Sequence, residues 1–389
     1  MRIASSAIAS NFSDLLRVEI TLFLNSDGIP AADISISDNR RLNLTLAALP
    51  VDALNRSDTP KMYGAKLSLW LFVPEMEELL LKIIERTERY SNSNHANGVR
   101  LQICLSPELP PSFHQIRWET LEYRGIQLSV EWAFSRLMRL SSPVRQPSLR
   151  FPKRMISIVA DPDCPLDQLD YLIQQTENKS LGPLQSLIDI DPRSGRNQSF
   201  LQFKKTLSEN LYDIVQFVAY ASFNGQQAWL AFRNEDGEEQ LVSFEEIRDQ
   251  FGNLPDKVVP YDNIPYLVVL VTPLKGQLED GTAWLRLAPM LLSVGVQAVV
   301  AITAPIKEDC ILIFLGKFYE LLLQTGSIDS AFAEARYETK QQYPDGWEWV
   351  YPVLYVRNSA PKLYGLPIEY SDNDLLSNFA SYIKKIDIL

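Results

Sequence analysis

The residue types that most often carry covalent chemistry are scarce in this chain. It has two histidines, His95 and His114, and three cysteines, Cys104, Cys164 and Cys310. A cysteine attacks a carbonyl as the thiolate, and a neighbouring histidine commonly supplies the base. No histidine follows residue 114, so the rest of the chain cannot supply a cysteine–histidine pair by itself.

The surroundings of these side chains favour structural roles. His95 in "SNSNHANG" is expected in an exposed loop, and His114 in "PPSFHQI" in a surface turn. Cys310 lies at the start of the apolar stretch "EDCILIFLG", where a buried structural thiol is expected. Cys164 has acidic neighbours, which raise the pKa of a thiol. Scattered cysteines without a CxxC pair are typical of free thiols in a reducing compartment.

Composition excludes several classes of function. The net charge of −11 over 389 residues disfavours a nucleic-acid or anionic-membrane surface, because both need a basic face. No apolar run reaches the roughly 18 residues of a membrane helix, and the N-terminus lacks the apolar core of a signal peptide. A soluble, cytoplasmic protein without nucleic-acid or membrane partners is therefore predicted.

Neither a cofactor nor a metal site is predicted. The sequence lacks both kinds of glycine-rich phosphate loop. The carboxylates of residues 233–240, "RNEDGEEQ", do not fall in the ligand register of a calcium loop. A solvated hairpin with Asp236 and Gly237 at its tip is the simpler interpretation of this segment.

The first part of the chain mixes strand and helix patterns. Residues 14–46 alternate apolar and polar side chains, which predicts strands with one face toward water. Residues 74–90 predict an amphipathic helix opened by a proline, 98–106 a strand, and 116–125 a short helix ending at a glycine. The proline-rich stretch 141–154 is the best candidate for a linker, with a surface loop inside one domain as the alternative.

The second part repeats strands and helices. Strands are predicted at 154–162, 212–220, 266–273, 296–305 and 350–358, and helices at 166–177, 200–211, 286–295, 309–326 and 327–343. This pattern predicts an α/β fold with a mostly parallel sheet covered by helices on both faces. Because ligands bind beyond the carboxyl ends of such strands, the site is expected in the turns after Val218 and Leu270. The first of these turns is "ASFNGQ", residues 221–226.

Several phrases together resemble the CHAT domain, a caspase-like peptidase family found mainly in bacteria. The resembling phrases include "YDIVQFVAYASFNG", "YLVVLVTPLKG", "LAPMLLSVGVQAVVAITAPI" and "RLQICLSPELPPSFHQIRWETLEY". The resemblance spans roughly residues 40–360 and implies a caspase-like sheet flanked by helices. It divides the chain into an N-terminal α+β region (1–150), the core (151–360) and a C-terminal tail with a helix (361–389).

The resemblance also implies where catalytic residues would stand. In active members, one strand ends in His-Gly and the next in Asn-Ala-Cys. In this chain the histidine position falls on Tyr220 and its glycine on Ala221. The second turn falls on residues 271–273, namely Val271, Thr272 and, at the cysteine position, Pro273. The resemblance therefore predicts a catalytically dead member.

Two alternatives remain open at the sequence level. One is a peptidase with an unorthodox nucleophile, Ser222 or Thr272, or with residues borrowed from a partner chain. Lys275 is the candidate base, but an exposed lysine stays protonated near its reference pKa of about 10.4. Pro273 also removes a backbone N–H from a turn that would stabilise an oxyanion. The other alternative is a receptor that binds peptides in the remnant cleft without cleaving them.

The expected partner is another protein. By family analogy, the chain would regulate an active CHAT peptidase or join a repeat or adaptor protein in a bacterial stress or defence assembly, as a homo- or hetero-oligomer. Residues 373–389 predict a helix that could dock on a partner or pack on its own domain. Its apolar face comprises Leu375, Leu376, Phe379, Ile383 and Ile386.

Overall fold

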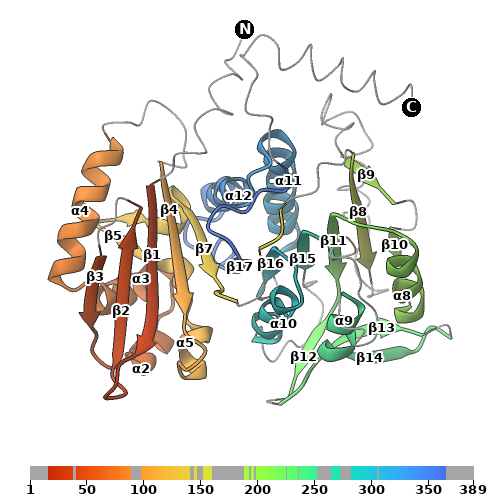
Figure 1. Ribbon diagram of the computed structural model, residues 1–389, viewed down its shortest axis with the longest axis horizontal. Coiled ribbons are helices and arrows are strands. Elements are labelled where there is room, and N and C mark those ends of the chain that lie inside the picture. Colours follow the sequence, from red (N-terminus) through yellow and green to blue (C-terminus); the bar gives the residue numbers. More distant parts are fainter. Residues whose placement is uncertain are drawn as a thin grey trace, which may run out of the picture.

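The computed structural model of the chain is shown in Figure 1. It describes residues 16–37, 41–88, 98–140, 144–146, 152–159, 188–191, 194–196, 199–224, 226–234, 236–251, 264–271, 282–304 and 306–364. The elements of the first part are β1 (Leu16–Leu24), β2 (Pro30–Ile36), β3 (Arg41–Thr45), α2 (Val51–Asn55), α3 (Pro60–Leu71), α4 (Pro74–Glu88), β4 (Val99–Leu105), α5 (Pro111–Gln115), η2 (Trp118–Thr120), β5 (Glu122–Tyr123), β6 (Ile126–Gln127), α6 (Leu128–Glu131) and β7 (Ala133–Leu137). Those of the second part are β8 (Lys153–Val159), β9 (Ile188–Ile190), β10 (Gly195–Arg196), α8 (Phe200–Glu209), β11 (Ile214–Val218), β12 (Ala221–Phe223), β13 (Ala228–Arg233), β14 (Glu239–Ser243), α9 (Phe244–Gln250), β15 (Leu267–Val271), α10 (Thr282–Ser293), β16 (Ala298–Ile302), α11 (Glu308–Thr325), α12 (Ile328–Gln342) and β17 (Pro352–Val356).

One large β-sheet contains strands from both parts of the chain. Its strand order is β10-β8-β11-β15-β16-β17-β7-β4-β1-β2-β3, with β9 also paired to β8. The pairs are mostly parallel; β16 with β17, β1 with β2, and β2 with β3 are antiparallel. The predicted α/β fold with a mostly parallel sheet is confirmed. Strands β17 and β7 join the two parts through the pair Tyr355–Arg136, while the division at residue 150 stays a prediction.

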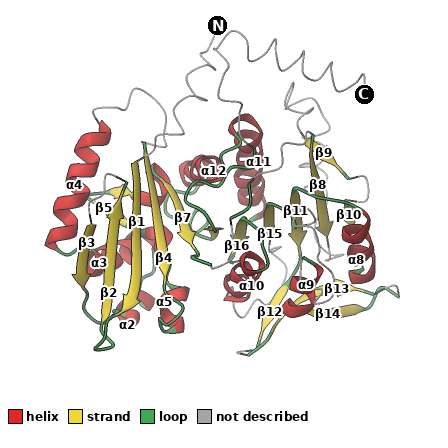
Figure 2. Ribbon diagram, viewed as in Figure 1, coloured by secondary structure: helices red, strands yellow, loops and turns green. Residues whose placement is uncertain are grey.

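Helices cover both faces of the second part of the sheet (Figure 2). One face packs on α11 and α12, with Val269 and Phe314 in a shared buried cluster. The other face packs on α8, α9 and α10 and on the small β12-β13-β14 sheet, with Phe217 and Trp284 in the cluster. The sequence of a strand buried on both faces is a continuous apolar run, because alternate side chains enter two different cores.

The first part of the sheet buries one face against α3 and α4. Val18 and Ile20 of β1 pack in a cluster with Leu67 of α3 and Leu80 of α4. The solvent-exposed face predicted for these strands is only partly present, because Glu19, which lies on the other side of β1 from Val18 and Ile20, is 1% exposed. Its carboxylate accepts hydrogen bonds from Arg17 at 2.6 Å and from Arg139.

Local signals explain where several helices begin and end. Ser199 and Gln202 form a capping box at the start of α8, and Ser243 and Glu246 form one at the start of α9. Helix α11 ends at Gly326 with φ 69°, a left-handed cap that glycine adopts without strain. The helices predicted at 200–211 and 309–326 are confirmed within a few residues, whereas α9 was not predicted.

The predicted helix at 116–125 is wrong. Residues in this stretch form the single turn η2 and then strand β5, which pairs with β6. Arg124 and Gly125 have φ 51° and φ 82°, the geometry of a tight hairpin turn that a helix cannot contain. The predicted hairpin at 233–240 is confirmed, because β13 pairs with β14 across Arg233 and Glu239.

Among the helices in the described ranges, none has both the length and the apolar composition needed to cross a membrane.

Candidate functional site

The carboxyl ends of β11 and β15 lie side by side, as the parallel sheet requires. Val218 and Val271 are partners in the last register position, and the Ala219 N–H donates to the Val271 carbonyl at 3.2 Å. Tyr220 follows two residues after β11 and is half-buried. The two predicted turns therefore start at one edge of the sheet, although Thr272, Pro273 and Lys275 lie outside the described residues.

The residues after Tyr220 form a strand, so the predicted turn at 221–226 is wrong at its start. Ala221 is buried and Ser222 exposed in β12, where Ser222 pairs with Trp229 of β13. The Tyr220 carbonyl accepts from the Ala231 N–H at 3.0 Å. The bend comes later, at Asn224, whose side chain accepts backbone N–H groups from the following residues. Alternating apolar residues in this segment were the signal for a short strand.

The described histidine and cysteines lie away from this edge or inside cores. Cys104 is in β4, five strand positions from β11 in the sheet, or roughly 24 Å at about 4.8 Å per strand. Burial raises the pKa of its thiol, and the Glu19 carboxylate raises it further. Cys310 is fully buried near the start of α11, as predicted, and burial raises the pKa of its thiol as well. His95 and Cys164 lie outside the described residues.

His114 is not in a surface turn, contrary to the prediction. It lies in the last turn of the short helix α5, one residue before its end at Gln115, and it is half-buried. Burial lowers the pKa of its imidazole, and the positive charge of Arg136 lowers it further. Its backbone carbonyl, not its ring, contacts Arg136, accepting a hydrogen bond at 3.1 Å.

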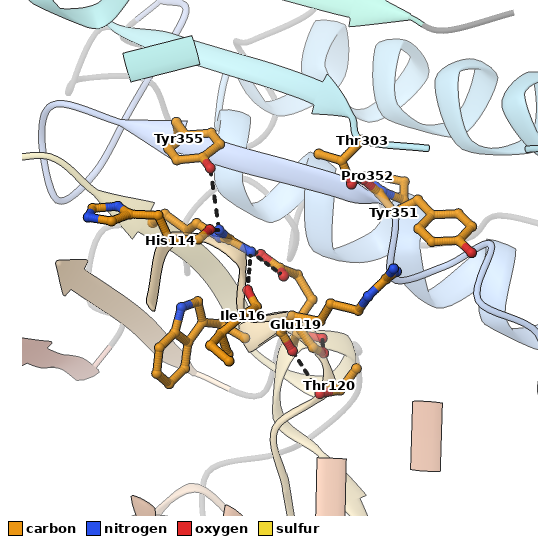
Figure 3. Close-up of polar contacts among 12 residues, drawn as sticks. His114, Ile116, Glu119, Thr120, Thr303, Tyr351, Pro352 and Tyr355 are labelled. Atoms are coloured by element: carbon orange, nitrogen blue, oxygen red, sulfur yellow. Dashed lines mark hydrogen bonds and ion pairs between the residues drawn. The ribbon is translucent and has the colours of Figure 1, made fainter. Parts of the chain in front are cut away.

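A buried arginine on β7 organises this region. The Arg136 Nε and Nη2 donate to the two carboxylate oxygens of Glu119 at 2.9 and 2.8 Å. Nη1 donates to the His114 carbonyl and to the Tyr355 hydroxyl at 3.1 and 3.3 Å, and Nη2 to the Ile116 carbonyl at 2.9 Å (Figure 3). Five donors thus have five acceptors. Burial alone would lower the pKa of Arg136, but the Glu119 carboxylate outweighs it and holds that pKa above its usual range.

A cavity of about 130 Å³ lies against this ion pair. Its walls come from α5 and the segment after it, from β7, α10 and β17, and from Thr303 and Ala304 at the carboxyl end of β16. The Thr303 hydroxyl donates to the Tyr351 carbonyl at 2.9 Å (Figure 3). Part of the cavity wall therefore lies just beyond the carboxyl end of β16, a position where α/β proteins place their ligands.

Arg117 also lines the cavity, and its guanidinium is held by aromatic rings. Its Cζ lies 4.7 Å from the ring centre of Trp347 and 5.2 Å from that of Tyr351. Trp347 is fixed in turn by an edge-on contact with Tyr63 at 5.9 Å. Aromatic faces attract and orient a guanidinium while leaving its in-plane N–H groups available.

The chemistry available at this cavity is binding chemistry. Both Glu119 oxygens are occupied by Arg136, so this carboxylate is poorly placed to accept a proton as a base. The Thr303 hydroxyl already donates its proton to a carbonyl. Among the described residues, no cluster of three or more His, Cys, Asp or Glu side chains could hold a metal ion.

Sequence reasoning missed Arg117, Glu119 and Arg136. The first two stand in the segment that was predicted as a helix. Arg136 lies in a strand, β7, that was not predicted. A charged residue inside the apolar run of β7 was the one available signal, because a buried arginine is rare unless it is paired.

Comparison with known proteins identifies the family. The model of the CHAT domain matches residues 61–358, which is most of the chain. The chain therefore belongs to the CHAT domain family, and the resemblance seen in the sequence is confirmed. No curated protein is similar enough in sequence to count as a match.

Two solved structures are similar in fold. One is the Saccharomyces cerevisiae separase–securin complex, with a TM-score of 0.47 and 11% identity, covering 89% of this chain and 30% of the matched chain. The other is the complex of Porphyromonas gingivalis RgpB pro- and mature domains, with a TM-score of 0.43 and 8% identity, covering 75% and 70%. The chain thus spans under a third of the length of the first matched chain.

Proposed function

We propose that this chain is a CHAT domain that has lost peptidase activity and acts by binding another protein. The observation that carries the proposal is the residue pair at the two aligned strand ends. Tyr220 stands two residues past β11, where the family resemblance places a histidine, and Pro273 stands where it places the cysteine. The core needs only the shape of its side chains, whereas the site needs particular atoms, so a fold can outlast its activity.

The remaining thiols and imidazoles support this proposal. Cys104 and Cys310 are buried, and burial raises the pKa of each thiol, so each favours the unreactive protonated form at neutral pH. His114 contacts Arg136 through its backbone. The partners consistent with the proposal are an active CHAT peptidase or a repeat or adaptor protein, as the family analogy implies.

A cleavage assay tests the proposal. Full-length protein is incubated with a broad mixture of peptides and with an electrophilic probe for nucleophilic cysteines, and new peptide termini are identified by mass spectrometry. The expected result is no new terminus above a buffer control. Turnover that persists through purification and disappears in Ser222→Ala or Thr272→Ala would contradict the proposal, because it would assign hydrolysis to an unorthodox nucleophile on this chain.

A further inference from the structure

The cavity beside Arg136 has one charge that the protein does not compensate. Arg136 and Glu119 neutralise each other through two short hydrogen bonds. The Arg117 guanidinium contacts the faces of Trp347 and Tyr351 and makes no hydrogen bond or ion pair with any described residue. The wall of the cavity therefore carries a net positive charge, in a chain whose net charge is −11.

We propose that this cavity binds the carboxylate of an acidic side chain presented by a peptide segment of a partner protein. This inference rests on the proposed function, since it assigns the chemistry of the bound partner. Arg117 would donate hydrogen bonds to the carboxylate, and its planar guanidinium matches the two oxygens of that group. Trp347 and Tyr351 hold the guanidinium in place, so little side-chain entropy is lost when the ligand binds.

The size of the cavity fits a side chain. Its volume is about 130 Å³, close to the roughly 150 Å³ of an engineered cavity in another protein that holds benzene. A glutamate or aspartate side chain has fewer heavy atoms than benzene, whereas a folded domain cannot enter. The apolar lining by Leu285 and Val353 suits the methylene groups of such a side chain.

A second guanidinium lies next to the cavity along α10. Arg286 follows the lining residue Leu285, is exposed, and has its Cζ 4.0 Å above the ring of Phe223 in β12. It too makes no hydrogen bond or ion pair with the described residues. Phe223 lies three residues after Tyr220, so Arg286 extends the positive charge from the cavity toward the end of β11. A peptide lying along this edge would gain from acidic residues flanking the inserted one.

The test uses the full chain and three pools of fluorescein-labelled hexapeptides, acetylated and amidated at their ends. Each pool has one fixed residue (Glu, Gln or Lys) at the third position and uncharged residues elsewhere. Fluorescence anisotropy is expected to show the Glu pool binding at least about tenfold more tightly than the Gln pool, because glutamine has no carboxylate to form a charge-assisted hydrogen bond with Arg117. The Lys pool is expected to bind most weakly.

Variants of Arg117 test whether this residue causes the preference for the Glu pool. Arg117→Gln is expected to abolish the preference for Glu over Gln, and Arg117→Lys to retain part of it. Arg124→Gln is the matched control, because Arg124 is an exposed arginine 5.3 Å over the ring of Tyr123 and does not line the cavity. Equal binding of the Glu and Gln pools, a preference that survives Arg117→Gln, or its loss in Arg124→Gln would overturn the inference.

A second readout does not depend on a variant of Arg117. In protein labelled with 5-fluorotryptophan, the resonance of Trp347, assigned with Trp347→Phe, is expected to shift when the Glu pool is added. Shifts confined to other tryptophans would overturn the inference. Glutarate serves as the free carboxylate, and binding of glutarate without binding of any pool would also overturn it. Loss of acid preference without cleavage leaves the non-catalytic function standing, whereas cleavage of the pools contradicts that function itself.

Discussion

At the scale of the residue, the cavity is lined by the buried ion pair of Glu119 with Arg136 and by a second arginine, Arg117, whose charge is not paired with a described residue. Glu119 and Arg136 are 1% and 4% exposed and are joined by two hydrogen bonds. Such pairs contribute to geometry more than to stability, because the cost of desolvation offsets the attraction. Arg117, held by two rings, is then the charge that remains for a ligand.

Glu119→Gln is expected to lower the free energy of unfolding by about 3–5 kcal/mol, since it leaves the Arg136 charge buried without its counterion. Urea denaturation measures the change. The double variant Glu119→Gln with Arg136→Met is expected to recover part of the loss, because no unpaired buried charge remains. Glu78→Gln, in the exposed pair with Lys82, is the control and should change stability little. A similar small effect in Glu119→Gln would contradict the assignment.

His114 is expected to titrate below the reference pKa of 6.5, because burial and the charge of Arg136 both disfavour the imidazolium. A group with a lower pKa in the folded state binds its proton more readily when unfolded. Its contribution to stability is therefore complete above about pH 6.5 and is lost as the pH falls through the folded pKa. Nuclear magnetic resonance of the His95→Gln variant leaves one imidazole to follow, and a midpoint at or above 6.5 would refute the expectation.

At the scale of the element, close backbone approach positions the segment that carries Arg117. Helix α3 packs on η2 at Gly64, where an added Cβ would lie 2.0 Å from the Thr120 carbonyl oxygen. Trp70 of α3 contacts Trp118 of η2, with ring centres 6.3 Å apart. Because Gly64 has no side chain, η2 can lie close against α3. This contact positions Glu119, which is in η2, and Arg117, which immediately precedes η2.

Gly64→Ala is expected to destabilise the protein by about 1–3 kcal/mol through overpacking, although alanine is the better helix former. Gly316→Ala in α11 is the matched control, because an added Cβ there meets nothing within 4 Å. That variant should gain up to about 1 kcal/mol from helix propensity. Thermal or urea denaturation compares the two, and effects of the same sign would contradict the packing described for Gly64.

The elements with a local signal could be predicted, and those defined by distant partners could not. Helices α8, α11 and α12 and the central strands follow from capping residues and from apolar runs. The cavity could not be foreseen, because Arg117, Trp347 and Tyr351 meet only after β7 pairs with β17. Segment 116–125 was mistaken for a helix because its hairpin turn at Arg124 and Gly125 lacks the usual asparagine or aspartate.

At the scale of the whole molecule, buried polar contacts tie the two parts of the sheet together. Arg100 of β4 pairs with Asp329 of α12, and both are buried. Arg336 of α12 donates to the carbonyls of Ser129, Trp349 and Pro352 at 3.2, 3.1 and 2.6 Å. Burial lowers the pKa of Arg336 to about 10, so its charge persists at neutral pH. Two parts joined in this way are expected to unfold together.

Hydrogen exchange in increasing urea tests that expectation. Amides of β4 and of β15 should open with the same midpoint, since losing either part exposes the core of the other. Arg336→Met, which leaves three buried carbonyls without a donor, should lower both midpoints together. Opening of β4 at a distinctly lower urea concentration would instead support an independent N-terminal domain.

We propose above all that this CHAT domain binds acidic peptide segments without cleaving them. The most direct measurement incubates the full chain with the Glu pool, separates the bound peptides by rapid gel filtration, and determines their masses. Peptides enriched over the Gln pool are expected to be recovered at full length. Shortened peptides, absent when Ser222→Ala or Thr272→Ala protein is used, would contradict it.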